Sequence, residues 1–191
     1  MPLVSPAANL ETICEECFAD PPPFLQCFAP FTYHFPMDQL IAAMKYQNRP
    51  QLSKLLAKLM IKSLAKSQQQ APELFIPIPM HPSRQRLRGY NQAHYLAKHL
   101  ANYLNTPLAD QILVKSQHTD SQKGLSAKDR QANLASAFSV NVKALQKLPS
   151  VTHVVLVDDV ITTGATMKAA AQCLHDAGIE RIDIWAVART P

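Results

Sequence analysis

Residues 154–166, VVLVDDVITTGAT, decide the fold of this 191-residue chain. The stretch Val151–Val157 is mostly apolar and β-branched, which is typical of a parallel strand buried on both faces. We predict a helix from about Ala165 to Ala177, ended by Gly178, and a second apolar strand over Ile182–Val187. Strand, helix and strand in this order predict a right-handed crossover unit and therefore an α/β fold.

The same stretch carries the strongest chemical signal. Asp158 and Asp159 follow the predicted strand, and ligands of open parallel sheets bind beyond the carboxyl ends of strands. Adjacent carboxylates can accept hydrogen bonds from both vicinal hydroxyls of a ribose. The residues after them supply hydroxyl groups, close backbone approach and a helix N-terminus that favours phosphate: Thr162, Thr163, Gly164, Ala165 and Thr166. The alternative is an ordinary strand-to-helix turn with threonine caps and two surface acids.

We expect both acids to lie at the strand end and outside the core, so that replacing them by asparagine leaves the fold intact. Other nucleotide and metal motifs are missing: the sequence has no G-x-x-x-x-G-K-[ST], no G-x-G-x-x-G and no H-E-x-x-H.

Composition limits the class of protein. Hydrophobic residues make up 47% and charged residues 17%, which is typical of a globular domain. No run approaches the roughly 20 apolar residues of a membrane span, and residues 1–9 do not resemble a signal peptide, so we expect a cytoplasmic protein. The net charge of +5 suits an anionic substrate, weak nucleic-acid contact or an ordinary basic surface.

Upstream of the central stretch, two amphipathic helices are predicted, one capped by Asp38 and one restarted by Pro50. A strand over Leu74–Pro79 leads into a basic loop, His81–Gly89, and Asn91 can cap the next helix. The remaining predicted elements are a short strand at Ile112–Val114, an exposed loop at Gln117–Lys123, a short helix starting at Ser126 and extended chain at Ala137–Val140.

The N-terminal segment differs from the rest. Residues 1–30 are irregular, with prolines at 21–23, and we interpret them as an arm before a domain over residues 31–191. Cys14 and Cys17 form a C-x-x-C pair, which is half of a zinc site, while Cys27 is either a third ligand or part of the next strand. Cys173 falls in the predicted helix and is expected in the core.

Three groups of residues resemble a known family. Residues 155–166 resemble the 5-phosphoribosyl diphosphate signature of type I phosphoribosyltransferases. FIPIP at 75–79 with RQRLRGYNQ at 84–92 resembles the "VPVP…RxRGFNQ" segment of the competence protein F (ComF) family. Further matches are Lys45-Tyr46 with the early "LKY", and Thr119, Gln122, Leu125, Arg130, Asn133, Ala137 and Phe138 with "T..Q..L…R..N…AF". The resemblance covers roughly residues 14–190.

The resemblance implies a type I phosphoribosyltransferase fold, with a central mostly parallel sheet flanked by helices and a small N-terminal hood or arm. It implies that Asp158 and Asp159 hold the ribose hydroxyls and that residues 162–166 wrap the 5-phosphate. Arg84, Arg86 and Arg88 would meet the diphosphate, although a solvated basic loop is the alternative. Mg²⁺ would bridge diphosphate and ribose oxygens, and a loop over 117–130 would cover the site.

The implied activity is transfer of a phosphoribosyl group to an unknown acceptor, in a role linked to DNA uptake and natural transformation. Two alternatives stay open: a non-catalytic DNA-uptake protein that works with a helicase and single-stranded DNA, and a regulator that senses the ligand without chemistry. Dimers are common in this fold, so a homodimer is possible. For a general base, His81, His94 and His118 are candidates only by residue type, and a surface role is the alternative for each.

Many ComF-like proteins carry a cysteine-rich zinc ribbon before the catalytic domain. Cys14 and Cys17 resemble the last pair of such a ribbon, and the earlier pair has no counterpart in this chain. We therefore interpret the N-terminal arm as the remnant of a zinc-ribbon-like segment, with Zn²⁺ binding doubtful.

Overall fold

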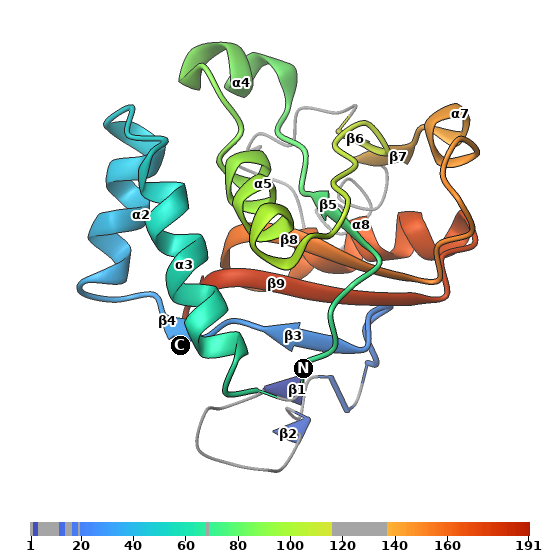
Figure 1. The fold of residues 1–191 in the computed structure, drawn as a ribbon, viewed down its shortest axis with the longest axis horizontal. Helices are drawn as coiled ribbons and strands as arrows, with labels where there is room; N and C mark the ends of the chain where they lie inside the picture. The colour runs from blue at the N-terminus through green and yellow to red at the C-terminus, as the bar shows by residue number, and fades with distance from the viewer. Residues whose placement is uncertain (1, 4–11, 14–16, 19, 68, 116–136) are drawn as a thin grey trace, which may run out of the picture.

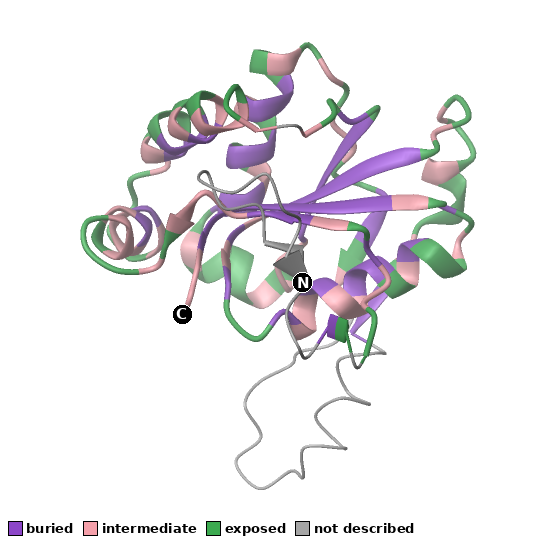
Figure 2. Cartoon of the chain, turned by 90° about the horizontal axis from the view of Figure 1, so that it is seen from below, coloured by how far each residue is buried: buried purple, intermediate pink, exposed green. Residues whose placement is uncertain are grey.

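A computed structural model describes residues 2–3, 12–13, 17–18, 20–67, 69–115 and 137–191 of the chain. In these residues a central, mostly parallel sheet carries helices on both of its faces (Figure 1). Its central strands are buried almost throughout, whereas the outer surfaces of the helices are exposed (Figure 2). The α/β class and the central parallel sheet predicted from the sequence are confirmed.

The main sheet has the strand order β2-β1-β3-β9-β8-β5, and β4 also pairs with β9. The pairs β3–β9, β9–β8 and β8–β5 are parallel, and β1–β2 is antiparallel. The bounds are β1 Pro2–Leu3, β2 Thr12–Ile13, β3 Gln26–Phe28, β4 Phe31–Thr32, β5 Leu74–Pro77, β8 His153–Ile161 and β9 Arg181–Arg189. A separate antiparallel pair is formed by β6 (Leu113–Lys115) and β7 (Phe138–Val140).

Strand β8 is buried on both faces because its side chains alternate between two cores. Val154 and Leu156 pack in a cluster with α8 (Ala165–Asp176), while Val155 and Val157 pack in a cluster with the helices of the opposite face. Those helices are α2 (Met37–Tyr46), α3 (Leu52–Leu64) and α5 (Gln92–Leu104). The predicted buried strand and the helix that follows it are therefore confirmed.

Strand β8 is longer than predicted. The expected strand ended at Val157, but pairing with β9 continues through Asp158↔Ala186 to Ile161↔Arg189. The acids therefore lie inside the last part of the strand and not beyond it. The physical reason is that β9 itself runs on to Arg189 and continues to offer backbone partners.

The predicted loop over His81–Gly89 is wrong, because Pro82–Arg88 forms helix α4. The His81 side chain accepts a hydrogen bond from the Ser83 amide, and Pro82 stands in the first turn. Gly89 ends the helix in the left-handed region, with φ of 85°. None of the seven residues of α4 is buried, so the segment lacks the apolar periodicity by which a helix is recognised from sequence.

Smaller differences concern helix starts. Pro36 occupies the position before α2, so Asp38 lies in its first turn and does not cap it, and α3 begins two residues after Pro50. Asn91 caps α5 as predicted: its side chain accepts from the Ala93 amide at 3.0 Å. The predicted loop at 117–123 and helix at Ser126 lie outside the described residues. Among the helices that the structure describes, none is long and apolar enough to cross a bilayer.

Candidate functional site

The two acids of β8 have different surroundings. Asp159 has the same strand parity as Val155 and Val157, which places it on the face covered by α2, and it is only 2% exposed. Asp158 is partly exposed, and its Oδ1 accepts a hydrogen bond of 2.8 Å from the Asp159 backbone amide. The expectation that both acids lie outside the core is therefore wrong for Asp159.

Lys45 provides the counter-charge for Asp159. Its Nζ lies 2.9 Å from Oδ2 of Asp159, and the side chains are 19% and 3% exposed. Burial acts to lower the pKa of Lys45, but the Asp159 carboxylate outweighs burial, so the pKa is raised and the ammonium stays charged. In the sequence, Lys45 matched only a family motif, and it was not predicted as a site residue. Its place in the last turn of an amphipathic helix was the available signal.

For Asp158 the described residues record no ion pair. Burial first, and then the neighbouring Asp159 carboxylate, raise the pKa of Asp158 to about 8. Among the described residues the structure records one ion pair for these two carboxylates, that between Lys45 and Asp159. The end of β8 therefore carries one carboxylate in an ion pair, Asp159, and one acid, Asp158, that protonates more readily than a free aspartate.

The turn after β8 has the form that the sequence predicted. Thr162 and Thr163 are exposed, and Gly164 adopts φ of 74°, in the left-handed region that favours glycine. Helix α8 begins immediately afterwards at Ala165, and the Thr163 hydroxyl accepts from the Ala165 amide at 3.4 Å. The acids, the hydroxyl groups and the N-terminus of a helix thus follow one another within nine residues.

Positive charge comes from α4 and the end of β6. Arg88 donates from Nη1 to Gln92 Oε1 at 2.6 Å, and its guanidinium lies 5.4 Å from the centroid of the Tyr46 ring. The pKa of Lys115 is lowered by burial and then by the charge of Arg84, while Asp158 acts to raise it. Lys115 therefore experiences both the arginine helix and the acid pair. Lys115 was not predicted as a site residue.

The three predicted arginines share one short helix but differ in their surroundings. Arg84 and Arg86 are exposed, and Arg88 is half-buried. Their helix stands at the upper edge of the molecule in Figure 1, between the end of β5 and the start of α5.

A cleft of about 310 Å³ lies between the end of β5, α4 and the start of α5. It adjoins the acid-bearing strand, because the Ile78 amide donates to the Val157 carbonyl at 2.9 Å. His94 lines the cleft, and its Nδ1 lies 3.2 Å from Asp110 Oδ2. The cleft is lined by Pro77, Pro79, Met80, Gln85, Gly89, Tyr90, Asn91, His94, Tyr95 and Asp110.

The three candidate general bases, all histidines, lie in different parts of the chain. His81 is the N-cap of α4, and His94 is the one that lines the cleft. His118 lies outside the described residues. The choice of a general base among these histidines therefore stays a prediction.

Comparison with known proteins agrees with this geometry. Residues 91–191 match the phosphoribosyl transferase domain family. The chain is 37% identical to Competence protein F of Haemophilus influenzae over 180 residues, covering 92% of this chain and 78% of that protein. The chain belongs to the competence protein F family. Its fold is accordingly the type I phosphoribosyltransferase fold.

Other relatives of this competence protein F family member carry related names. It is 31% identical to DNA utilization protein YhgH of Salmonella typhimurium, over 97% of this chain and 81% of that protein. It is 26% identical to Competence protein ComFC of Streptococcus pneumoniae, over 83% of this chain and 66% of that protein.

The cysteines of this family member are divided between the core and the N-terminal segment. Cys27 is buried in the middle of β3, as one of the two alternatives predicted, and burial raises its pKa to about 12. Cys17 is also buried, in the same apolar cluster, whereas Cys14 lies outside the described residues. Cys173 is partly buried against that cluster. Within the described ranges, no three His, Cys, Asp or Glu side chains gather as metal ligands.

Proposed function

We propose that this protein binds 5-phosphoribosyl 1-diphosphate with Mg²⁺ at the carboxyl end of β8 and transfers its phosphoribosyl group to an acceptor. One observation carries the proposal. The buried strand β8 presents the acid pair Asp158–Asp159 directly before a glycine turn that opens α8. This is the arrangement that a sugar with vicinal hydroxyls and a 5-phosphate requires.

Each part of the ligand has a matching group. Asp158, the more accessible acid, would accept hydrogen bonds from the ribose hydroxyls, with Asp159 held in place behind it by Lys45. The 5-phosphate would lie at the start of α8, where Thr162, Thr163 and Thr166 offer hydroxyl groups and the backbone around Gly164 and Ala165 offers amides. The arginines Arg84, Arg86 and Arg88 on α4 and the ammonium of Lys115 would face the diphosphate.

The residues at this site fit Mg²⁺. The donors are carboxylate oxygens, which a hard cation prefers, and a dication beside Asp158 would favour its ionised form against the burial and the Asp159 charge that raise its pKa. When bound, Mg²⁺ would neutralise charge that builds on the departing diphosphate. Asp158 would hold the ion or its water shell, together with oxygens of the ligand itself.

In the proposed reaction, the bond between the anomeric carbon and the diphosphate oxygen breaks, and a bond to a nitrogen or related nucleophile forms. The diphosphate leaves with the electron pair, and the sugar carries positive charge in the transition state. The protein would contribute by positioning the ligand and by stabilising the leaving group with its cations. A ligand sensor would use the same binding groups without turnover.

Isothermal titration calorimetry with 5-phosphoribosyl diphosphate and Mg²⁺ tests the binding proposal. We expect saturable binding by the wild-type protein and a loss of about tenfold to a hundredfold in affinity for Asp158→Asn, because a charged hydrogen-bond acceptor is lost. Asp176→Asn, an exposed carboxylate on α8, is the matched control and should bind as the wild type does. A folded wild-type protein without binding contradicts the proposal.

Release of diphosphate in the presence of candidate acceptors separates the enzyme from the sensor. Continuous release with one acceptor class supports transfer. Tight binding with no release from any acceptor class supports the sensor.

We also propose a role in DNA uptake, alongside a helicase and single-stranded DNA. The names of the relatives favour it: one is called a competence protein and another a DNA utilization protein. The net charge of +5 permits contact with a polyanion. Fluorescence anisotropy with a labelled single-stranded oligonucleotide, measured over a range of salt concentrations, tests direct contact. Affinity that falls as salt rises supports contact, and no binding even at low salt leaves only an indirect role.

A further inference from the structure

The last turn of α2 touches the candidate site through three consecutive residues, 44–46. The first accepts a hydrogen bond at its backbone carbonyl from the Tyr90 hydroxyl. The second, Lys45, forms the ion pair with Asp159, with 2.9 Å between Nζ and Oδ2. The third, Tyr46, has its ring centroid 5.4 Å from the guanidinium carbon of Arg88. One short segment therefore connects the acid-bearing strand β8, the helix α4 and the start of α5.

Stability alone does not account for a lysine at position 45. A buried ion pair contributes little compared with apolar side chains of similar volume, because both charges lose their hydration. The neighbouring Ile41 and Met44 are fully buried in the apolar cluster, so a longer apolar residue would suit the position. What the lysine provides is a positive charge fixed beside two adjacent carboxylates.

That charge matters for an anionic ligand. When Asp158 is ionised as well as Asp159, the two carboxylates at the end of β8 would repel the phosphate and diphosphate groups of the proposed substrate. Lys45 cancels one of the two charges and fixes the Asp159 carboxylate on the α2 side of the strand. Asp158, for which the described residues record no ion pair, stays partly exposed.

We propose that Lys45 is a positioning residue of the ribose-diphosphate site, acting through Asp159, and that residues 44–46 hold the acid pair and the arginine helix in one arrangement. The inference rests on the proposed function. Lys45 does not touch the ligand in this scheme. It sets the charge and the orientation of Asp159, which lies behind the ligand-binding Asp158, and Tyr46 keeps Arg88 on the same side of the site.

Calorimetric titration of 5-phosphoribosyl diphosphate with Mg²⁺ tests this inference on four proteins: the wild type, Lys45→Met, Lys45→Arg and the control Lys58→Met. Lys58 is an exposed lysine on α3. We expect Lys45→Met to lose about tenfold to a hundredfold in affinity, as when a residue that orients a ligating group is removed. Lys45→Arg should recover most of that loss, and Lys58→Met should match the wild type.

Lys45→Met leaves a buried carboxylate without a partner and could fail to fold. The double variant Lys45→Met/Asp159→Asn removes both charges and therefore keeps the test valid. We expect its melting temperature to recover toward that of the wild type while its affinity for the ligand stays low. All titrations are made at a temperature where each variant is folded by circular dichroism.

The outcomes separate the two proposals. A wild-type protein that binds no ligand overturns the proposed function, and this inference with it. A wild-type protein that binds, with equal affinity in folded Lys45→Met, overturns this inference alone and reduces Lys45 to a structural ion pair. A recovery of affinity in the double variant also contradicts it, because cancelling the Asp159 charge, and not holding its carboxylate in place, would then be the whole role of Lys45.

Discussion

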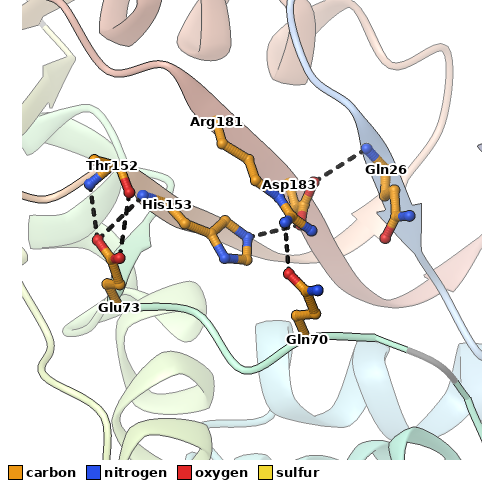
Figure 3. Close-up of polar contacts among 7 residues, drawn as sticks. All are labelled: Gln26, Gln70, Glu73, Thr152, His153, Arg181 and Asp183. Atoms are coloured by element: carbon orange, nitrogen blue, oxygen red, sulfur yellow. Dashed lines mark hydrogen bonds and ion pairs between the residues drawn. The ribbon is translucent and has the colours of Figure 1, made fainter.

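The two ends of strand β8 both carry buried charge, but the buried acids differ in how many partners surround them. At the amino end, Asp183 accepts at Oδ1 from the Gln26 amide at 3.2 Å, and its Oδ2 lies 2.7 Å from His153 Nε2 and 3.3 Å from Arg181 Nη2 (Figure 3). At the carboxyl end, Asp159 has the single ion pair with Lys45 among the described residues.

Glu73, also at the amino end of β8, likewise has several hydrogen-bond donors around its carboxylate. Its two carboxylate oxygens accept from the Thr152 amide at 2.7 Å, the Thr152 hydroxyl at 3.2 Å and the His153 amide at 3.3 Å. The hydrogen bonds from the Thr152 and His153 amides lower the pKa of Glu73, whereas burial and Asp159 raise that of Asp158. A carboxylate with several hydrogen-bond donors stabilises the fold, and one with few donors is available to a ligand.

The largest effect should follow from removing the acid at the amino end. Asp183→Asn leaves His153 and Arg181 without their buried partner, and breaking a buried pair costs about 3 kcal/mol of unfolding free energy. Equilibrium urea unfolding measures it, with Asp176→Asn as the exposed control. A loss similar to that of the control would show that the amino-end network adds nothing to stability.

At the carboxyl end, Asp158→Asn should weaken ligand binding by about tenfold to a hundredfold. The same substitution should make the unfolding free energy depend less on pH. Because folding raises the pKa of Asp158 to about 8, its contribution to stability is present below about pH 4 and is lost as pH rises through about 8. Asparagine does not titrate, so the fall in unfolding free energy between pH 5 and pH 9 should shrink. Urea unfolding at both values checks this, and an unchanged difference contradicts it.

Valine substitutions at Gly164 and Gly178 separate a loss of the phosphate site from the backbone strain that a side chain causes at positive φ. Gly164→Val should lower the unfolding free energy by about 1–2 kcal/mol, because a side chain is disfavoured at positive φ, and should also abolish ligand binding. Gly178→Val provides the matched control, since Gly178 has φ of 93° at the far end of α8. It should show comparable strain with normal binding in calorimetry. Equal binding by both variants would move the phosphate cradle elsewhere.

The smallest effect is expected for Glu73→Gln, because Glu73 is exposed. Folding lowers its pKa, so its contribution is present above about pH 4 and is lost as pH falls through the folded-state value. This sign is opposite to that of Asp158. Urea unfolding between pH 6 and pH 3 should show a shallower acid-side loss in the variant. A steeper loss than in the wild type would reverse the assignment.

The predictable parts of this molecule are those with a local pattern. The apolar run before Asp158, the glycine turn and the Asn91 cap each have a period or a residue type that determines the local structure. The crossover and the parallel sheet follow from their order along the chain.

The parts that the sequence did not reveal depend on contacts between distant residues. Lys45 meets an acid 114 positions away, and Gln26 donates to Asp183 across 157 positions. Helix α4 was missed for another reason: it has no buried face, and it depends on its caps, His81 and Gly89. The burial of Asp159 likewise depends on α2 covering its face of the sheet, which no local pattern reports.

The most direct test of the contrast between the two ends is a calorimetric titration of 5-phosphoribosyl diphosphate with Mg²⁺ into the wild type, Asp158→Asn and Glu73→Gln under one set of conditions. We predict equal dissociation constants for the wild type and Glu73→Gln, and binding weaker by about tenfold to a hundredfold for Asp158→Asn. Unchanged binding in folded Asp158→Asn, or its loss in Glu73→Gln, would contradict the assignment of ligand binding to the carboxyl end of β8.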